Sequence, residues 1–128
     1  MRMAMPKILV VDDELHIIKI LDYKLRGAGY TVISAKDGVE ALEKAKAERP
    51  DLILLDVMMP KLDGFETLEA LKRDPDTQGI PVFMLTVRGR AVDRMRGQEL
   101  GIADYITKPF SPTKLLAKID GVFQKKGG

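Results

Sequence analysis

The residues of this sequence that could do chemistry share one position: each directly follows a short apolar run. They are Asp12, Asp13, Asp56, Thr86 and Lys108. If each run is a strand of a parallel sheet, these residues stand at the carboxyl ends of their strands, where α/β proteins bind ligands. Three carboxylates, an ammonium group and a hydroxyl group would then meet in one crevice.

Such a cluster of carboxylates needs a cation. At about 5 Å and an effective dielectric constant of about 20, each carboxylate pair repels by on the order of 3 kcal/mol. Lys108 supplies one positive charge, and Mg²⁺ suits the remainder because it favours carboxylate, carbonyl, water and phosphate oxygens. Zinc is disfavoured, since cysteine is absent and the single histidine, His16, falls on the first predicted helix. Aspartates, a lysine, a hydroxyl group and Mg²⁺ are the components of phosphoryl transfer.

Asp56 is the best candidate for the nucleophile of such a reaction. An aspartate carboxylate is an established covalent acceptor of phosphate. Asp56 stands alone after the middle run, whereas the adjacent pair Asp12 and Asp13 is better suited to hold the metal ion. An isolated pair of aspartates more often makes a turn or a helix cap. Here the agreement among several strand ends favours a functional site.

The elements that must position these residues alternate regularly along the chain. Five apolar runs without polar alternation predict central strands that are covered on both faces. They are Ile8–Val11, Thr31–Ala35, Leu52–Leu55, Val82–Leu85 and Tyr105–Thr107. The stretches between and after them have helical periodicity. Asp37 can cap the second helix, and Ser111 with Pro112 can begin the last one. The fourth helix, roughly Ala91–Leu100, has the weakest apolar stripe.

This alternation predicts a flavodoxin-like, doubly wound α/β fold. We expect a five-stranded parallel sheet with right-handed connections, the strand order 2-1-3-4-5 and five helices. In that order strands 1, 3, 4 and 5 are contiguous, so their polar ends converge. The order is inferred from the size of the chain and from this convergence, because no single residue encodes it.

Composition predicts one globular domain. The 128 residues are 45% hydrophobic and 31% charged, and we expect a single domain over 1–128 with a core of about 7–124 and flexible tails at 1–5 and 125–128. The net charge of +2 does not indicate direct nucleic-acid binding.

No apolar run approaches the roughly 20 residues of a membrane span, and no secretory signal is visible. We therefore expect a cytoplasmic protein without membrane insertion, and no output domain within this sequence.

Four segments resemble the receiver domain of bacterial response regulators. They are Ile8–Glu14, Asp56–Gly64, Leu85–Thr86 and Tyr105–Phe110. Each segment alone is weak, but their order and spacing together are specific, and the resemblance extends from Lys7 to about Gln124. It implies a phosphorylation-dependent switch of a two-component system, with phosphorylation and dephosphorylation chemistry of its own, and not a turnover enzyme.

The resemblance also implies roles for individual residues. Asp56 would accept a phosphoryl group from a phosphohistidine on a sensor histidine kinase or phosphotransfer protein. Asp13, Asp56 and the backbone carbonyl of Met58 would coordinate Mg²⁺, and Asp12 would assist through water. Thr86 and Lys108 would bind the phosphoryl oxygens.

The same resemblance implies how the signal leaves the site. Thr86 would move toward the phosphoryl group and Tyr105 would turn inward, which would reshape the face made by the fourth helix, fifth strand and fifth helix. A downstream output protein would bind that face, and the chain would be a monomer or a phosphorylation-dependent dimer. The Lys108–Pro109 peptide would be cis. Val87 departs from the alanine that is frequent after the switch threonine, and we expect it to restrict access to the site.

Three other functions compete with this interpretation. A flavin carrier of the same topology needs a phosphate-binding loop after the first strand, where Asp12, Asp13 and Glu14 would repel phosphate. An aspartyl-phosphate phosphatase places a second acid two residues after its nucleophile, and this chain has Met58 there. A degenerate receiver acting only as a protein-binding module is the third alternative, and the filled acceptor and ligand positions count against it.

Several other polar residues are predicted to be structural. We expect His16 to be an exposed helix residue and Asp63–Gly64 to form a turn or cap into the third helix. The arginines of the fourth predicted helix region are expected to form a solvated face on the output side, where they could set partner choice. They are Arg88, Arg90, Arg94 and Arg96.

Overall fold

The computed structural model describes residues 5–59, 61–87, 96 and 98–127. Five strands form a single sheet: β1 Lys7–Val11, β2 Thr31–Ala35, β3 Leu52–Asp56, β4 Val82–Val87 and β5 Asp104–Lys108. Four helices lie in the described part of the chain: α1 Leu15–Gly27, α2 Gly38–Glu48, α3 Gly64–Arg73 and α5 Pro112–Gly127. The predicted helix at Ala91–Leu100 lies mostly outside the described residues, among which Arg96 and 98–100 are helical.

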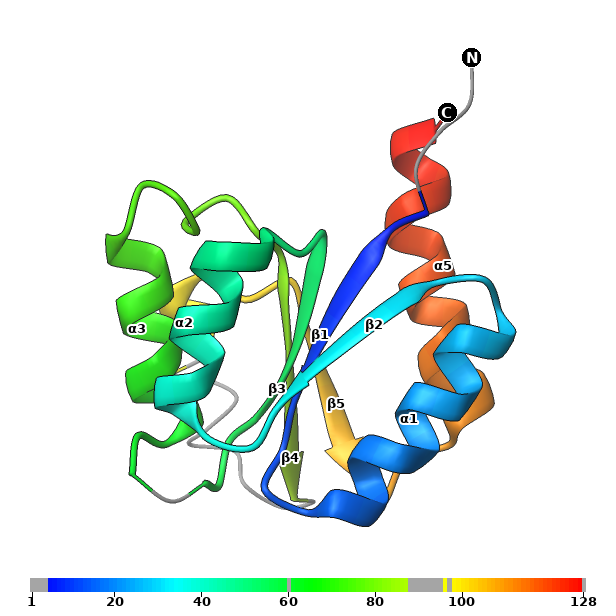
Figure 1. The fold of residues 1–128 in the computed structure, drawn as a ribbon, viewed down its shortest axis with the longest axis horizontal. Coiled ribbons are helices and arrows are strands. Elements are labelled where there is room, and N and C mark those ends of the chain that lie inside the picture. The colour runs from blue at the N-terminus through cyan, green and yellow to red at the C-terminus, as the bar shows by residue number, and fades with distance from the viewer. Residues whose placement is uncertain (1–4, 60, 88–95, 97, 128) are drawn as a thin grey trace.

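The sheet has the predicted strand order. All neighbouring strands are parallel and the order is β2-β1-β3-β4-β5, as Figure 1 shows. Three strands run beyond the predicted apolar runs at their carboxyl ends, so that Asp56 and Lys108 are the last residues of β3 and β5 and Thr86 lies inside β4. The polar residues are therefore held by sheet hydrogen bonding instead of following the strands in loops.

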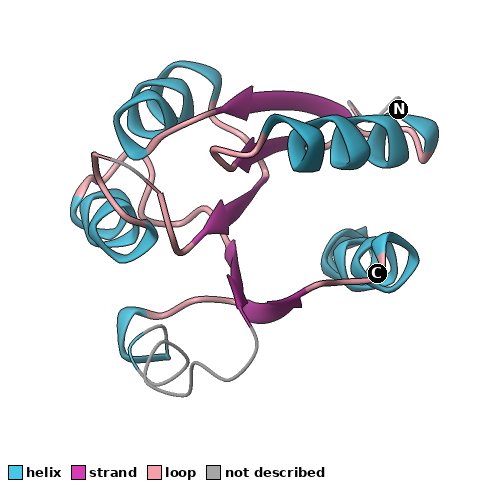
Figure 2. Ribbon diagram, turned by 90° about the horizontal axis from the view of Figure 1, so that it is seen from below, coloured by secondary structure: helices cyan, strands magenta, loops and turns pink. Residues whose placement is uncertain are grey.

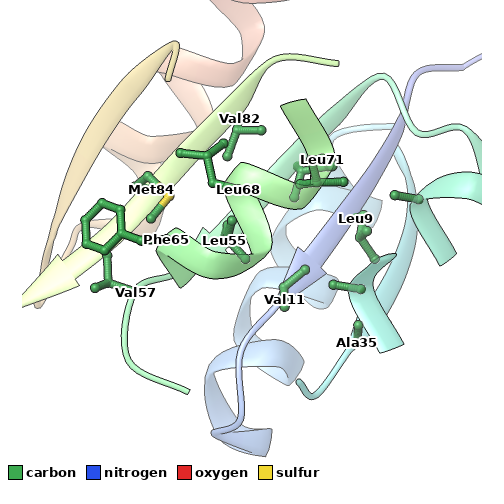
Figure 3. Close-up of a cluster of buried hydrophobic side chains, with 13 residues drawn as sticks. Leu9, Val11, Ala35, Leu55, Val57, Phe65, Leu68, Leu71, Val82 and Met84 are labelled. Atoms are coloured by element: carbon green, nitrogen blue, oxygen red, sulfur yellow. The ribbon is translucent and has the colours of Figure 1, made fainter. Parts of the chain in front are cut away.

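Helices cover both faces of the sheet, as the apolar runs predict. α1 and α5 pack on one face and α2 and α3 on the other (Figures 1 and 2). Alternate residues of β1 and β3 serve the two layers. Leu9, Val11, Ile53 and Leu55 belong to the cluster on the α2–α3 side, shown in Figure 3, and Ile8, Val10, Leu52 and Leu54 belong to the cluster on the α1–α5 side. All eight are fully buried, which explains why these strands show no polar alternation.

The starts of α2, α3 and α5 follow the predicted signals. The side chain of Asp37 accepts a hydrogen bond of 2.8 Å from the Glu40 N–H and caps α2. Asp63 and Glu66 form a reciprocal capping box at the start of α3, and Ser111 Oγ accepts from the Lys114 N–H at 3.2 Å. Gly29 follows α1 with a φ of +100°, a conformation that favours glycine after a helix. The three side-chain caps fix where α2, α3 and α5 begin relative to the carboxyl edge of the sheet.

Across the described segments, the helices lack the combination of length and apolarity that a membrane span requires.

Candidate metal centre at the carboxyl edge of the sheet

Three aspartates meet where β1 and β3 end. Asp12 and Asp13 directly follow β1, and Asp56 is the last residue of the adjacent strand β3. One carboxylate oxygen from each of the three lies within 4.8 Å of the others. Asp12 is 0% exposed and Asp56 is 4% exposed, whereas Asp13 is exposed. The cluster is therefore buried on the sheet side and accessible from solvent through Asp13.

The side chain of Lys108 reaches this cluster from the end of β5, which is two strands from β3 in the sheet. Its Nζ lies 2.8 Å from Asp12 Oδ2 and 3.3 Å from Asp56 Oδ1. It also lies 3.6 Å from Glu14 Oε1, a contact that the sequence does not indicate, because Glu14 lies in the predicted loop after the first strand. The peptide between Lys108 and Pro109 is cis, as the family resemblance implies.

Both oxygens of Asp12 already have protein partners. Oδ1 accepts a hydrogen bond of 2.9 Å from the Glu14 N–H, and Oδ2 accepts from Lys108 Nζ at 2.8 Å. The β1–α1 connection is held further by a hydrogen bond from the Asp12 N–H to the Ala35 carbonyl of β2. Asp12 is thus oriented by its surroundings before any ligand binds, and its position suits an indirect contact to a ligand better than a direct one.

Burial and charge set the protonation of the site. Burial and the neighbouring charge of Asp12 raise the pKa of Asp56 to about 6, although Lys108 and a backbone hydrogen bond from Met58 oppose the rise. Burial alone would lower the pKa of Lys108, but its hydrogen bond to Asp12 and the charge of Asp56 outweigh burial, so this pKa is raised above its ordinary value. Lys108 therefore remains an ammonium ion near neutral pH.

The donor set fits a hard divalent cation. Three carboxylates face one partly buried ammonium group, so negative charge is in excess, and the candidate carboxylate ligand atoms are oxygens held within 4.8 Å of one another. Mg²⁺ prefers such ligands and keeps part of its water shell, for which the exposed side of Asp13 leaves room.

The remaining predicted site residues lie around this centre. Thr86 is 5% exposed and follows Leu85, the residue of β4 that pairs with Asp56. Met58 lies two residues after Asp56, and its side chain is largely exposed. Tyr105 is half-buried in β5 and packs against the cluster on the α2–α3 side. The structure thus places Thr86 beside Asp56 in the sheet and Met58 two residues after it in the chain, while Tyr105 lies in β5 on the α2–α3 face.

Two of the remaining polar residues, His16 and Arg96, lie in the described part of the chain. His16 is exposed, and its Nε2 lies 4.0 Å from Glu14 Oε2. Arg88, Arg90 and Arg94 lie outside the described residues. Arg96 is exposed, as expected, and its guanidinium group also lies 4.7 Å from the centre of the Phe65 ring and 3.9 Å from Glu69, both on α3.

Comparison with known proteins shows one consistent similarity. The sequence profile of the response regulator receiver domain matches residues 8–120. The chain is 49% identical over 119 residues to the alkaline phosphatase synthesis transcriptional regulatory protein PhoP of Bacillus subtilis, covering 93% of this chain and 49% of that protein. It is 41% identical over 121 residues to the DNA-binding dual master transcriptional regulator RpaA of Synechocystis, covering 94% of this chain and 50% of that protein. The chain spans about half the length of these curated relatives.

Solved structures agree with this similarity. The chemotaxis protein CheY4 of Vibrio cholerae superposes with a TM-score of 0.87 at 38% identity, covering 93% of this chain and 99% of that one. The N-terminal domain of a response regulator receiver protein from Methanoculleus marisnigri superposes with a TM-score of 0.76 at 42% identity, covering 93% and 97% of the two chains.

Proposed function

This chain belongs to the response regulator receiver domain family, and we propose that it is a phosphorylation-dependent switch in which Asp56 accepts the phosphoryl group. The observation that carries the proposal is the environment of Asp56. Its carboxylate ends β3 beside two further aspartates, and one of its oxygens lies 3.3 Å from the Lys108 ammonium group. Acceptor, cation ligands and a fixed positive charge are thus within reach of one another.

The proposed reaction transfers a phosphoryl group from a phosphohistidine of a sensor kinase or phosphotransfer protein. A carboxylate oxygen of Asp56 forms a bond to phosphorus while the phosphorus–nitrogen bond of the donor breaks, and its electron pair stays on the imidazole. The nucleophile must be ionised. With a pKa of about 6, Asp56 is mostly ionised at pH 7.

We assign Mg²⁺ to Asp13, Asp56 and the backbone carbonyl of Met58, with Asp12 acting through water. The engagement of both Asp12 oxygens by Glu14 and Lys108 supports the indirect role of Asp12. When bound, the ion would neutralise charge on the carboxylates and on the transferring phosphoryl group. Lys108 and Thr86 are assigned to the phosphoryl oxygens. Thr86 lies near the end of β4, which is beside β3, and Lys108 is the last residue of β5, the next strand in the sheet.

The output is proposed to leave through the face formed by the predicted fourth helix, β5 and α5, with Thr86 and Tyr105 as the switching residues. The relatives named above are transcriptional regulators about twice the length of the matched region. We therefore propose that a downstream output protein binds this face, and that the receiver is a monomer or a phosphorylation-dependent dimer. We also propose that it is cytoplasmic.

Phosphorylation with a small phosphodonor tests this function. Wild type and Asp56→Asn are incubated with Mg²⁺ and acetyl phosphate, and the protein is assayed for acid-stable, base-labile phosphate. Label in wild type that is absent from Asp56→Asn supports the proposal. Equal label in both proteins contradicts the assignment of Asp56, and no label in a folded wild type favours the protein-binding module.

A further inference from the structure

The connection between β3 and α3 carries the Met58 carbonyl that we assign to the metal, so its shape matters for the site. Of this connection, 57–59 and 61–63 are described. Its far end is closed by a hydrogen bond of 2.8 Å from the Gly64 N–H to the Val57 carbonyl. A Cβ on Gly64 would lie 2.4 Å from the Asp56 carbonyl oxygen. The start of α3 therefore packs directly on the end of β3.

The middle of the connection rests on the first turn of α2, which begins beside it at the lower end of the sheet in Figure 1. A Cβ on Gly38 would lie 2.6 Å from Leu62 Cβ and 2.3 Å from Thr67 Oγ1. Thr67 is itself fully buried, and its hydroxyl donates to the Asp63 carbonyl at 2.9 Å. No side chain larger than hydrogen fits at position 38 without moving the connection.

An ion pair crosses the same contact. Lys61 Nζ lies 3.4 Å from Asp37 Oδ2, and Asp37 is 6% exposed. The other oxygen, Asp37 Oδ1, accepts from the Glu40 N–H and caps α2. Lys61 has a φ of +69°, a left-handed conformation that costs free energy for a residue other than glycine. The backbone of Lys61 is thus held in an unfavourable conformation at the point where its side chain meets a buried carboxylate.

We infer that Asp37 and Lys61 are positioning residues that hold the β3–α3 connection, and with it the Met58 carbonyl, in the geometry that binds the divalent cation. The inference rests on the proposed function and deepens it. Neither residue touches the cation. They act through the backbone of the connection, in the way that residues behind a metal ligand orient it.

Direct measurement of Mg²⁺ affinity by isothermal titration calorimetry tests the inference. Lys61→Met removes the charge and keeps the side-chain length, and Asp37→Asn removes the charge while keeping a good helix cap. Each is expected to weaken Mg²⁺ binding about two- to fivefold, the range that an ion pair with an exposed lysine can supply, and Lys61→Arg is expected to restore wild-type affinity. The double variant is expected to bind no more weakly than either single variant, because one pair is lost in every case.

Lys46→Met is the matched control. Lys46 also lies on α2 and pairs with Asp74 at 3.2 Å, but Asp74 is the C-cap residue of α3, at the opposite end of that helix from the β3–α3 connection. Its removal is expected to leave Mg²⁺ affinity unchanged. Phosphorylation adds a second measurement: the Asp37 and Lys61 variants need more Mg²⁺ for half-maximal label but reach the wild-type rate when Mg²⁺ is saturating.

The outcomes separate this inference from the proposed function. If wild type binds no Mg²⁺, or if Asp56→Asn is labelled as wild type is, the proposed function fails. If wild type binds Mg²⁺ and is labelled on Asp56 while Lys61→Met and Asp37→Asn bind Mg²⁺ as tightly as wild type, the positioning role is overturned. A lower melting temperature with unchanged Mg²⁺ affinity also overturns it, because the pair would then only stabilise the fold.

Discussion

Lys108 Nζ lies closer to Asp12 Oδ2, at 2.8 Å, than to Asp56 Oδ1, at 3.3 Å. The lysine therefore bridges a fully buried carboxylate and the proposed acceptor. Since a buried carboxylate without a counter-charge is costly, Asp12 holds Lys108 beside Asp56 before any phosphoryl group arrives. This bridge couples the ionisation of Asp56 to the charge of Lys108.

Replacing Lys108 by methionine should raise the pKa of Asp56 further above 6. Lys108 is the charge that opposes the rise caused by burial and by Asp12, so its loss leaves two adjacent carboxylates without compensation. NMR titration of the Asp56 carboxyl carbon without Mg²⁺ measures the change. Lys118→Met, which removes an exposed ion pair with Asp104, should leave this pKa unchanged. An Asp56 pKa that stays the same or falls in Lys108→Met would contradict the bridge.

In the metal-free protein, the contribution of Asp56 to stability should fall as the pH rises from about 4 to about 6. The pKa of Asp56 is 3.8 in the unfolded reference and about 6 in the fold, so the folded state binds the proton more tightly and this contribution is greatest below pH 4. The loss above pH 6 amounts to at most about 3 kcal/mol. Urea unfolding in EDTA should show Asp56→Asn gaining stability relative to wild type over this range. A difference between the two proteins that does not change with pH would exclude the raised pKa.

Gly64→Ala should destabilise the protein by about 1–3 kcal/mol, the usual cost of overpacking. The added Cβ would lie 2.4 Å from the Asp56 carbonyl oxygen and 2.7 Å from Val57 Cα, where the backbone cannot move without displacing Asp56. Gly79→Ala is the control, because a Cβ there meets nothing within 4 Å, and it should change stability by less than about 0.5 kcal/mol. Chemical denaturation of both variants measures the difference, and equal stabilities would disprove the close approach.

Val87→Ala should speed both the uptake of phosphate from acetyl phosphate and its later loss to water. Val87 is the last residue of β4 and pairs in register with Lys108. The position after the switch threonine is often alanine in the family, and we expect the larger residue to restrict the approach to Asp56. Labelling and decay rates at fixed Mg²⁺ measure the effect. If the rates of the two proteins are the same, Val87 does not restrict access.

Much of the fold could be read from the sequence because its signals are local. A fully apolar run such as Leu52–Leu55 can only be a covered strand or a buried helix, and its length and flanking residues favour the strand. Asp37, Asp63 and Ser111 cap their helices as predicted, because a cap depends on neighbours three residues away. The predicted fourth helix lies largely outside the described residues, so the structure adds little to that prediction.

Sequence pattern alone is enough to place the site residues at the carboxyl edge of the sheet, since the end of each apolar run lies within two residues of the end of a strand and parallel strands share an edge. How those residues pair follows only from the folded structure. Lys108 reaches Asp12 across 96 positions of the chain and Lys61 reaches Asp37 across 24. Such contacts depend on packing and side-chain conformation, which a pattern of residue types does not encode. The same reason explains the pKa of Asp56, because burial and the distances to Asp12 and Lys108 exist only once the strands are assembled.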